Sequence, residues 1–153
     1  MHRINFRGLN IRIEQKVGSV REGVNKKGEP WKVRFYYPYG FICDTMGKDG
    51  DEIDCFIGDY WESENVYIIH QLRPDGLYDE DKVMLGFRDL NSARDGYLAH
   101  YNTQGFIGKI TGMPFFEFKE KMKTVGRIGA MVKWLNLCWR LYLQYLLFHL
   151  SYL

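Results

Sequence analysis

Cysteine is scarce in this sequence. There are only three, Cys43, Cys55 and Cys138, and no two of them stand at C-x-x-C spacing. An odd number of widely spaced cysteines predicts neither a disulfide framework nor a structural zinc site. Free thiols are typical of a reducing compartment, so the cysteine content favours the cytoplasm.

A large net charge and an apolar N-terminal stretch are lacking as well. The 21 lysine and arginine residues nearly balance the 19 aspartates and glutamates, which leaves a formal charge of +2. Net charge alone therefore gives no support to nucleic-acid binding. The opening M-H-R-I-N-F-R carries positive charge with no apolar run behind it, so we expect no secretory signal.

The composition suits one packed domain, since 153 residues with 46% hydrophobic content suffice for a single core. Short β-branched and aromatic runs predict strands in the first half. Four of these runs are 11–13, 31–35, 53–57 and 65–69. Turn residues at 25–30 and 73–76 predict hairpin loops. Strands roughly ten residues apart without intervening helices favour a barrel-like antiparallel sheet over β-α-β units.

The pattern changes after a further predicted strand at 83–87. Asn91 or Ser92 can cap a helix, and its apolar positions recur every four residues at Ala93, Tyr97 and Tyr101. A second helix is expected to begin near Pro114, which suits a first turn. Its apolar face would hold Phe115, Phe118 and Met122.

The final segment is the compositional outlier. From Lys133 onward, polar residues form a narrow stripe on an otherwise apolar helical pattern. The span 134–153 is long enough to cross a bilayer, but Arg140 near its centre would be costly there. We therefore divide the chain into a domain at 1–125 and a helical tail at 126–153. For the tail we favour packing on its own domain or in a homo-oligomer, with contact to a membrane surface as the alternative.

The densest acidic run is Asp49–Asp54 (D-G-D-E-I-D). A tight bend at Gly50 can turn its three aspartates inward, where their repulsion is relieved by a divalent cation. Oxygen-only ligands suit Mg²⁺, with Mn²⁺ as the alternative. An EF-hand is excluded, because Asp54 and Tyr60 stand where its glycine and glutamate are required. Taken alone, however, Asp-Gly-Asp is more typical of a solvated turn.

A second acidic group lies downstream in Asp79–Lys82 (D-E-D-K), at the entrance of the predicted strand 83–87. Two acidic loops and a lysine can face each other across a sheet. Carboxylates that hold metals, with Lys and Arg on the remaining phosphate oxygens, meet the requirements of metal-assisted phosphoanhydride hydrolysis. In that chemistry a metal-activated water is the nucleophile.

These motifs resemble a known family. Tyr39–Ile42, Thr45 and Asp49–Asp54 are similar to the Y-G-Y/F-I…D-G-D-P-x-D signature of the soluble inorganic pyrophosphatases of family I. A closer resemblance is to the pyrophosphatase-like domain of phage and mobile-element proteins, carried also by Gly28–Trp31 and Asp79–Phe87. The resemblance spans roughly residues 11–123. It implies an α+β fold: a small antiparallel OB-like β-barrel with two or three helices packed against it and a helical C-terminal half.

The resemblance also implies roles for individual residues. The metal ligands would be Asp49, Asp51, Asp54, Glu80 or Asp79, and Glu14. Asp54 would in addition orient the attacking water, and Tyr39 would bond to the substrate. The phosphate-binding cations would be Arg21, Arg34, Lys82 and Lys119. Two positions depart from the family pattern, because Glu52 replaces the signature proline and Arg21 stands where a lysine is expected.

The function implied is metal-dependent hydrolysis of inorganic pyrophosphate to two phosphates, in the cytoplasm, or in that of a bacterial host if the protein is phage-encoded. One alternative is a catalytically weak or inactive accessory module on the same scaffold. Another is a hydrolase of a different diphosphate-containing small molecule. A nucleic-acid surface built on Trp31, Phe35 and Lys32 ranks last, because strand aromatics more often pack in the core. No nucleic-acid partner is expected.

Overall fold

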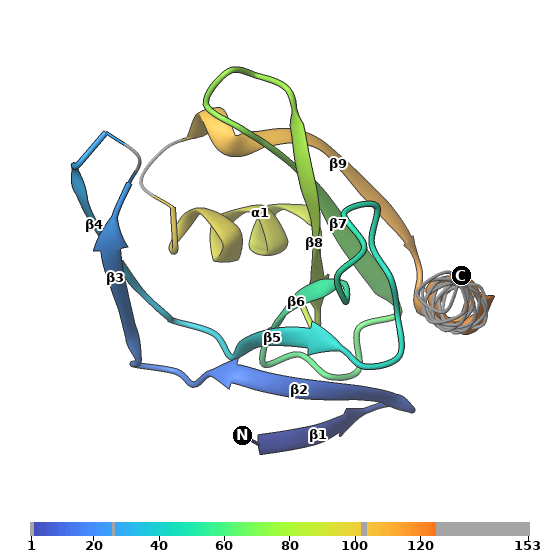
Figure 1. Cartoon of the computed structure of the whole chain (residues 1–153). Coiled ribbons are helices and arrows are strands. Elements are labelled where there is room, and N and C mark those ends of the chain that lie inside the picture. The colour runs from blue at the N-terminus through green and yellow to red at the C-terminus, as the bar shows by residue number, and fades with distance from the viewer. Residues whose placement is uncertain (1, 26, 102–103, 125–153) are drawn as a thin grey trace, which may run out of the picture.

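The computed structural model describes residues 2–25, 27–101 and 104–124 (Figure 1). The strands are β1 His2–Phe6, β2 Leu9–Gln15, β3 Val20–Val24, β4 Pro30–Arg34, β5 Tyr39–Ile42, β6 Asp54–Ile57, β7 Asn65–Leu72, β8 Tyr78–Leu85 and β9 Ile107–Pro114. The helices are α1 Leu90–Leu98, the short 3₁₀ helix η1 Gln104–Phe106, and a helical segment at 115–124. No helix among these residues is long and apolar enough to span a membrane, and the tail predicted at 126–153 lies outside them.

The strands form one open sheet and one separate ribbon. Seven strands pair in the order β1-β2-β5-β6-β8-β7-β9, and β3 pairs with β4 alone. β6 and β8 run parallel, and the remaining pairs in the described chain are antiparallel. Figure 1 shows the β3–β4 ribbon standing off the sheet, on the side where α1 lies.

The sheet is open, so the described residues do not form the predicted antiparallel barrel, and the predicted helical C-terminal half is not confirmed. β1 and β9 end the sheet as its two edges, and β8 and β9 place two strands in the second half of the chain. The physical reason is the position of β8, which inserts between β6 and β7 instead of extending the meander. Periodicity in the sequence identifies strands but carries no information about such an insertion.

The predicted hairpin loops are confirmed, and each contains a glycine with a left-handed backbone conformation that allows the tight turn. The turn between β3 and β4 is closed by the Asn25 side chain, which accepts hydrogen bonds from the backbone N–H groups of Lys27 and Glu29, both at 2.9 Å. Gly28 has φ +81° there, and Gly76 has φ +80° in the turn between β7 and β8. These left-handed conformations favour glycine.

The predicted helix near residue 91 exists, but Asp89 caps it. The Asp89 carboxylate accepts from the Ser92 backbone N–H, and the Ser92 hydroxyl accepts from the Asp89 N–H, which makes a reciprocal capping box. Tyr97 is buried as expected, whereas Tyr101 lies beyond the end of the helix. Gly96 permits close packing, since a Cβ there would lie 2.5 Å from the Phe87 ring.

The sheet lies between two hydrophobic clusters, because successive side chains on a strand face opposite sides. On β6, Cys55 and Ile57 belong to the cluster that includes Phe115 and Phe118 from the helical segment 115–124. Phe56 belongs to the opposite cluster, which includes Tyr97 from α1. This alternation decides which polar side chains of β6 and β8 share a face with α1.

Candidate active site

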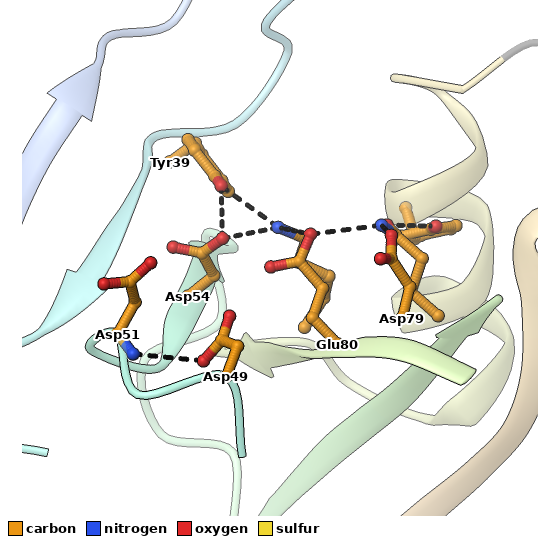
Figure 2. Close-up of polar contacts among 9 residues, drawn as sticks. Tyr39, Asp49, Asp51, Asp54, Asp79 and Glu80 are labelled. Atoms are coloured by element: carbon orange, nitrogen blue, oxygen red, sulfur yellow. Dashed lines mark hydrogen bonds and ion pairs between the residues drawn. The ribbon is translucent and has the colours of Figure 1, made fainter. Parts of the chain in front are cut away.

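Asp54 stands at the start of β6, on the same face of the sheet as Phe56. On the adjacent strand β5, Tyr39 pairs with Phe56, and its hydroxyl donates a hydrogen bond to Asp54 Oδ2 at 2.5 Å. Lys82 on the parallel strand β8 reaches the same oxygen, with an Nζ to Oδ2 distance of 2.5 Å. Three adjoining strands thus place three predicted site residues in direct contact. Figure 2 shows Tyr39 pointing toward Asp54.

Lys82 is the most deeply buried charged group of this cluster, with 3% of its surface exposed. Its Nζ also lies 2.8 Å from Glu80 Oε1 and 3.1 Å from the Tyr39 hydroxyl. Burial alone would lower the pKa of Lys82, but the nearby Tyr39, Tyr101, Asp54 and Glu80 outweigh it and raise that pKa above its usual value. An ammonium group held in this way stays protonated and compensates the carboxylates around it.

Tyr39 is buried beside this ion pair, and it stays un-ionised. Burial is the largest cause that raises its pKa, and the Asp54 carboxylate adds to it, while Lys82 opposes both. Its ring packs on Phe56 and Phe35, with centroid distances of 4.9 and 5.5 Å. The hydroxyl is therefore a fixed donor aimed at Asp54.

Glu80 and Asp79 are positioned by residues that sequence reasoning missed. Gln71 on β7 is buried, and its amide nitrogen donates to Asp79 Oδ2 at 2.9 Å and to Glu80 Oε1 at 3.2 Å. The Tyr97 hydroxyl on α1 donates to the side-chain oxygen Oε1 of Gln71 at 2.7 Å, which fixes the orientation of the side-chain amide. Both residues lie in stretches of apolar sequence. The one sign in the sequence was a polar residue, Gln71, at the end of an apolar strand. Burial is also the largest cause of the raised pKa of Glu80, opposed by Lys82.

The acidic loop before β6 is shaped by local hydrogen bonds. Gly50 has φ +91°, and the Asp49 carboxylate accepts from the Asp51 backbone N–H at 3.1 Å. The buried Thr45 hydroxyl accepts from the Ile53 N–H and donates to the Ile42 carbonyl oxygen. This loop closes one side of a small pocket of about 40 Å³, and β8 closes the other. Its lining includes Asp49, Asp54, Asp79 and Glu80.

The fold gathers some of the predicted site residues and leaves others elsewhere. Asp51 lies on the loop beside Asp49 (Figure 2). Arg21 lines a larger neighbouring cavity that Tyr39 also borders. Glu14 lines a different hollow, which Arg21 shares. Arg34 is exposed on β4, and Lys119 donates to the Arg7 carbonyl oxygen at 3.0 Å, beside another hollow. The last three residues are thus not brought to the acidic pocket.

The acidic pocket has the donor chemistry of a hard-cation site. Its carboxylate oxygens are the ligands that Mg²⁺ prefers. Within residues 2–25, 27–101 and 104–124, however, no three His, Cys, Asp or Glu side chains are arranged to hold a metal ion together. Between Asp54 and Glu80 the positive charge is supplied by the Lys82 ammonium group. The residue types of the pocket thus fit a divalent cation, while in this structure Asp54 and Glu80 are paired with Lys82.

The described chain is thus an α+β domain whose open mixed sheet carries a pocket of carboxylates beside a buried lysine, and comparison with known proteins names its family. The family model for Inorganic Pyrophosphatase matches residues 1–123. This chain belongs to the inorganic pyrophosphatase family, which confirms the resemblance seen in its sequence. Membership supports hydrolysis of inorganic pyrophosphate in general, and the family generally uses divalent metals.

Solved structures similar to this chain include three proteins of low identity. An inorganic pyrophosphatase from Neisseria gonorrhoeae is 16% identical over 78% of this chain and 90% of its own, with a TM-score of 0.46. A protein from Anaplasma phagocytophilum, described as an inorganic phosphatase, is 15% identical over 78% and 91%, with a TM-score of 0.45. The Coxiella burnetii inorganic pyrophosphatase is 12% identical over 75% and 89%, with a TM-score of 0.42. No curated protein sequence matches the chain.

Proposed function

We propose that this chain hydrolyses inorganic pyrophosphate to two phosphates, with Mg²⁺ as cofactor, at the pocket between the loop 49–54 and β8. The observation that carries the proposal is the contact of one carboxylate, Asp54, with both the Tyr39 hydroxyl and the Lys82 ammonium group. This trio forms in a chain of the inorganic pyrophosphatase family, beside further carboxylates that line the same pocket. Such an arrangement unites a proton acceptor, a neutral donor and a fixed cation.

Divalent ions would be held by Asp49, Asp51 and Asp54 of the loop, with Glu80 or Asp79 facing them from β8. When bound, Mg²⁺ offsets phosphate charge and makes a water molecule easier to deprotonate. Mn²⁺ has similar ligand preferences and would substitute. Glu14 remains a predicted ligand, although it lines a different hollow.

The side chains of the cluster divide the remaining work. Asp54 orients the attacking water and accepts its proton as the water oxygen bonds to phosphorus and the anhydride bond breaks. Tyr39 and Lys82 fix the carboxylate in place, and Lys82 also presents positive charge to a phosphate oxygen. Arg21, which lines the cavity beside Tyr39, can grip a second phosphoryl group with two parallel hydrogen bonds.

One observation favours a second candidate, a catalytically weak or inactive module on the same scaffold. Lys82 already pairs with both Asp54 and Glu80. In such a module that pairing would be permanent, and the carboxylates would not take up a metal. Binding of a phosphate compound without turnover would then be the function.

Phosphate release from pyrophosphate at saturating Mg²⁺ tests the proposal. Asp54→Asn removes the proton acceptor and should lower kcat by about 10²- to 10⁴-fold. Asp44→Asn makes the same chemical change at an exposed residue outside the pocket, with φ +62°, which asparagine tolerates; it should keep the wild-type rate. Equal rates in both variants, or no release by folded wild-type protein that binds Mg²⁺, would contradict the proposed function.

A further inference from the structure

A second cavity adjoins the acidic pocket, and it is far larger, at about 690 Å³. The aromatic residues in its lining are Trp31, Phe35, Tyr39, His100, Tyr101 and Phe106. We call this space the aromatic cavity. Tyr39 links the two sites, since it lines the aromatic cavity while its hydroxyl donates to Asp54 in the lining of the acidic pocket. A ligand in the aromatic cavity therefore lies next to the proposed reaction centre.

The ring surfaces in this cavity are held in place by the fold. Trp31 lies on the β3–β4 ribbon against Gly23 of the partner strand, where a Cβ would come within 2.7 Å of its ring. Trp31 is nevertheless 38% exposed. Tyr101, which also lines the cavity, packs on Tyr97 with a centroid distance of 4.6 Å. A partly exposed indole in a lining rich in aromatic rings offers the stacking surface that planar heterocycles use.

The cavity also carries positive charge. Arg21 and Lys32 of the ribbon line it, and the Arg21 guanidinium lies 5.9 Å from the centre of the Trp31 ring. The Lys82 ammonium group lies 3.1 Å from the hydroxyl of Tyr39, which also lines the cavity. The cations thus stand around an aromatic space, an arrangement that suits an anion with a planar ring system.

Inorganic pyrophosphate has no apolar surface to bury against these rings, whereas the cavity has the size of small-molecule sites, about 300–1,000 Å³. We propose that the substrate class extends to nucleoside 5′-diphosphates, with the base in the aromatic cavity beside Trp31 and the diphosphate directed past Tyr39 toward Lys82 and Asp54. This inference rests on the proposed function, because it uses the same reaction centre.

The reaction follows the same chemistry as pyrophosphate hydrolysis. The oxygen of water bonds to the terminal phosphorus, and the bond from that phosphorus to the bridging oxygen breaks. The bridging oxygen leaves on the nucleoside monophosphate, and the water proton passes through Asp54 to solvent. One nucleoside diphosphate and one water give one nucleoside monophosphate, one inorganic phosphate and one proton.

The test compares phosphate release from ADP, GDP and pyrophosphate at saturating Mg²⁺. Wild-type protein should hydrolyse at least one of the two nucleotides. Trp31→Ala should lower kcat/KM for that nucleotide roughly tenfold or more relative to kcat/KM for pyrophosphate, since stacking contributes about 1–3 kcal/mol per base. Trp31→Leu should lower the same ratio of kcat/KM values, because leucine fills space but has no ring on which a base can stack. Phe116→Ala, which removes an aromatic side chain 68% exposed and outside the cavity, should change neither rate.

The outcomes separate the two proposals. Hydrolysis of pyrophosphate alone, without binding of α,β-methylene-ADP in calorimetry, overturns the inference and leaves the proposed function intact. Full nucleotide activity in Trp31→Leu overturns the assignment of the aromatic cavity as the base site. Release from none of the three substrates overturns the proposed function, and the inference falls with it.

Discussion

Tyr39 links the acidic pocket and the aromatic cavity, since it lines the cavity and donates a hydrogen bond to Asp54 of the pocket, yet the two regions are built in different ways. The acidic pocket of about 40 Å³ is assembled on β5, β6 and β8 inside the seven-stranded sheet, where register fixes each side chain against the next. The aromatic cavity of about 690 Å³ is bounded by the detached β3–β4 ribbon and the segment after α1. Paired strands hold the side chains of the proposed reaction centre rigidly, whereas the proposed base site lies on peripheral elements.

The largest effect should come from the cation of the acidic pocket. Lys82→Met leaves the carboxylates of Asp54 and Glu80 without their buried partner, so we expect a loss of about 3–5 kcal/mol in the free energy of unfolding. Urea denaturation measures it. The matched control is Lys32→Met in the aromatic cavity, whose ion pair with Glu22 at 3.5 Å is mostly exposed; its loss should be small. Equal losses of unfolding free energy in Lys82→Met and Lys32→Met would contradict the view that only the acidic pocket depends on a buried cation.

Tyr39→Phe affects the residue that links the two regions. The ring contacts with Phe56 and Phe35 remain, while the hydrogen bond to Asp54 is lost. We expect kcat for pyrophosphate to fall about tenfold, the value of a hydrogen bond to a charged group. Steady-state phosphate release measures it, with the exposed Tyr36→Phe as control. An unchanged kcat would show that the hydroxyl does not position Asp54.

Gly23→Ala should alter the aromatic cavity more than the acidic pocket. The new methyl group would lie 2.7 Å from the Trp31 ring and must displace it. We expect kcat/KM for the nucleoside diphosphate to fall several-fold relative to that for pyrophosphate. Gly112→Ala on β9 is the control, since its Cβ would make an ordinary 3.4 Å contact with Tyr67. Equal changes for both substrates would argue against a base stacked on Trp31.

The smallest effect concerns His100, a titratable group in the lining of the aromatic cavity. Burial lowers its pKa below the usual 6.5, and its Nε2 accepts from the Tyr36 backbone N–H. As the pH falls below about 6.5, His100 becomes protonated in the unfolded chain but stays neutral in the folded chain. The free energy of unfolding therefore decreases. Between pH 7.5 and 5.5 the melting temperature should fall a few degrees further in wild type than in His100→Gln. The exposed His2→Gln should behave like wild type; a wild-type response in His100→Gln would contradict this account.

The acidic pocket was largely predictable from sequence, and the aromatic cavity was not. Asp49 and Asp54 lie in one local run, and the roles of Tyr39 and Lys82 came from the resemblance to the pyrophosphatase family. The structure places these two residues on the strands that flank β6. The insertion of β8 beside β6, which opened the expected barrel, depends on long-range pairing that periodicity does not encode. Trp31 was assigned to core packing because its strand pattern gives no sign of the empty space beside it.

Residues that act through others were also missed. Gln71 and Tyr97 carry the hydrogen bonds that orient Glu80 and Asp79, yet each sits in an apolar stretch that reads as ordinary core. Their role appears only when β7, β8 and α1 are brought together. Glu14, Arg34 and Lys119, taken from the family resemblance, stay predictions that the arrangement of the acidic pocket does not use.

The most direct test of the central claim is the initial rate of phosphate release from pyrophosphate by the full chain as Mg²⁺ is raised from zero. The account predicts no release in the presence of a chelator and a rate that rises with Mg²⁺ to saturation, because the carboxylates around Lys82 need a divalent cation to accept a substrate of like charge. A rate independent of divalent metal, or no release at any Mg²⁺ concentration from folded protein, would contradict the claim that the acidic pocket is a metal-dependent pyrophosphate hydrolase.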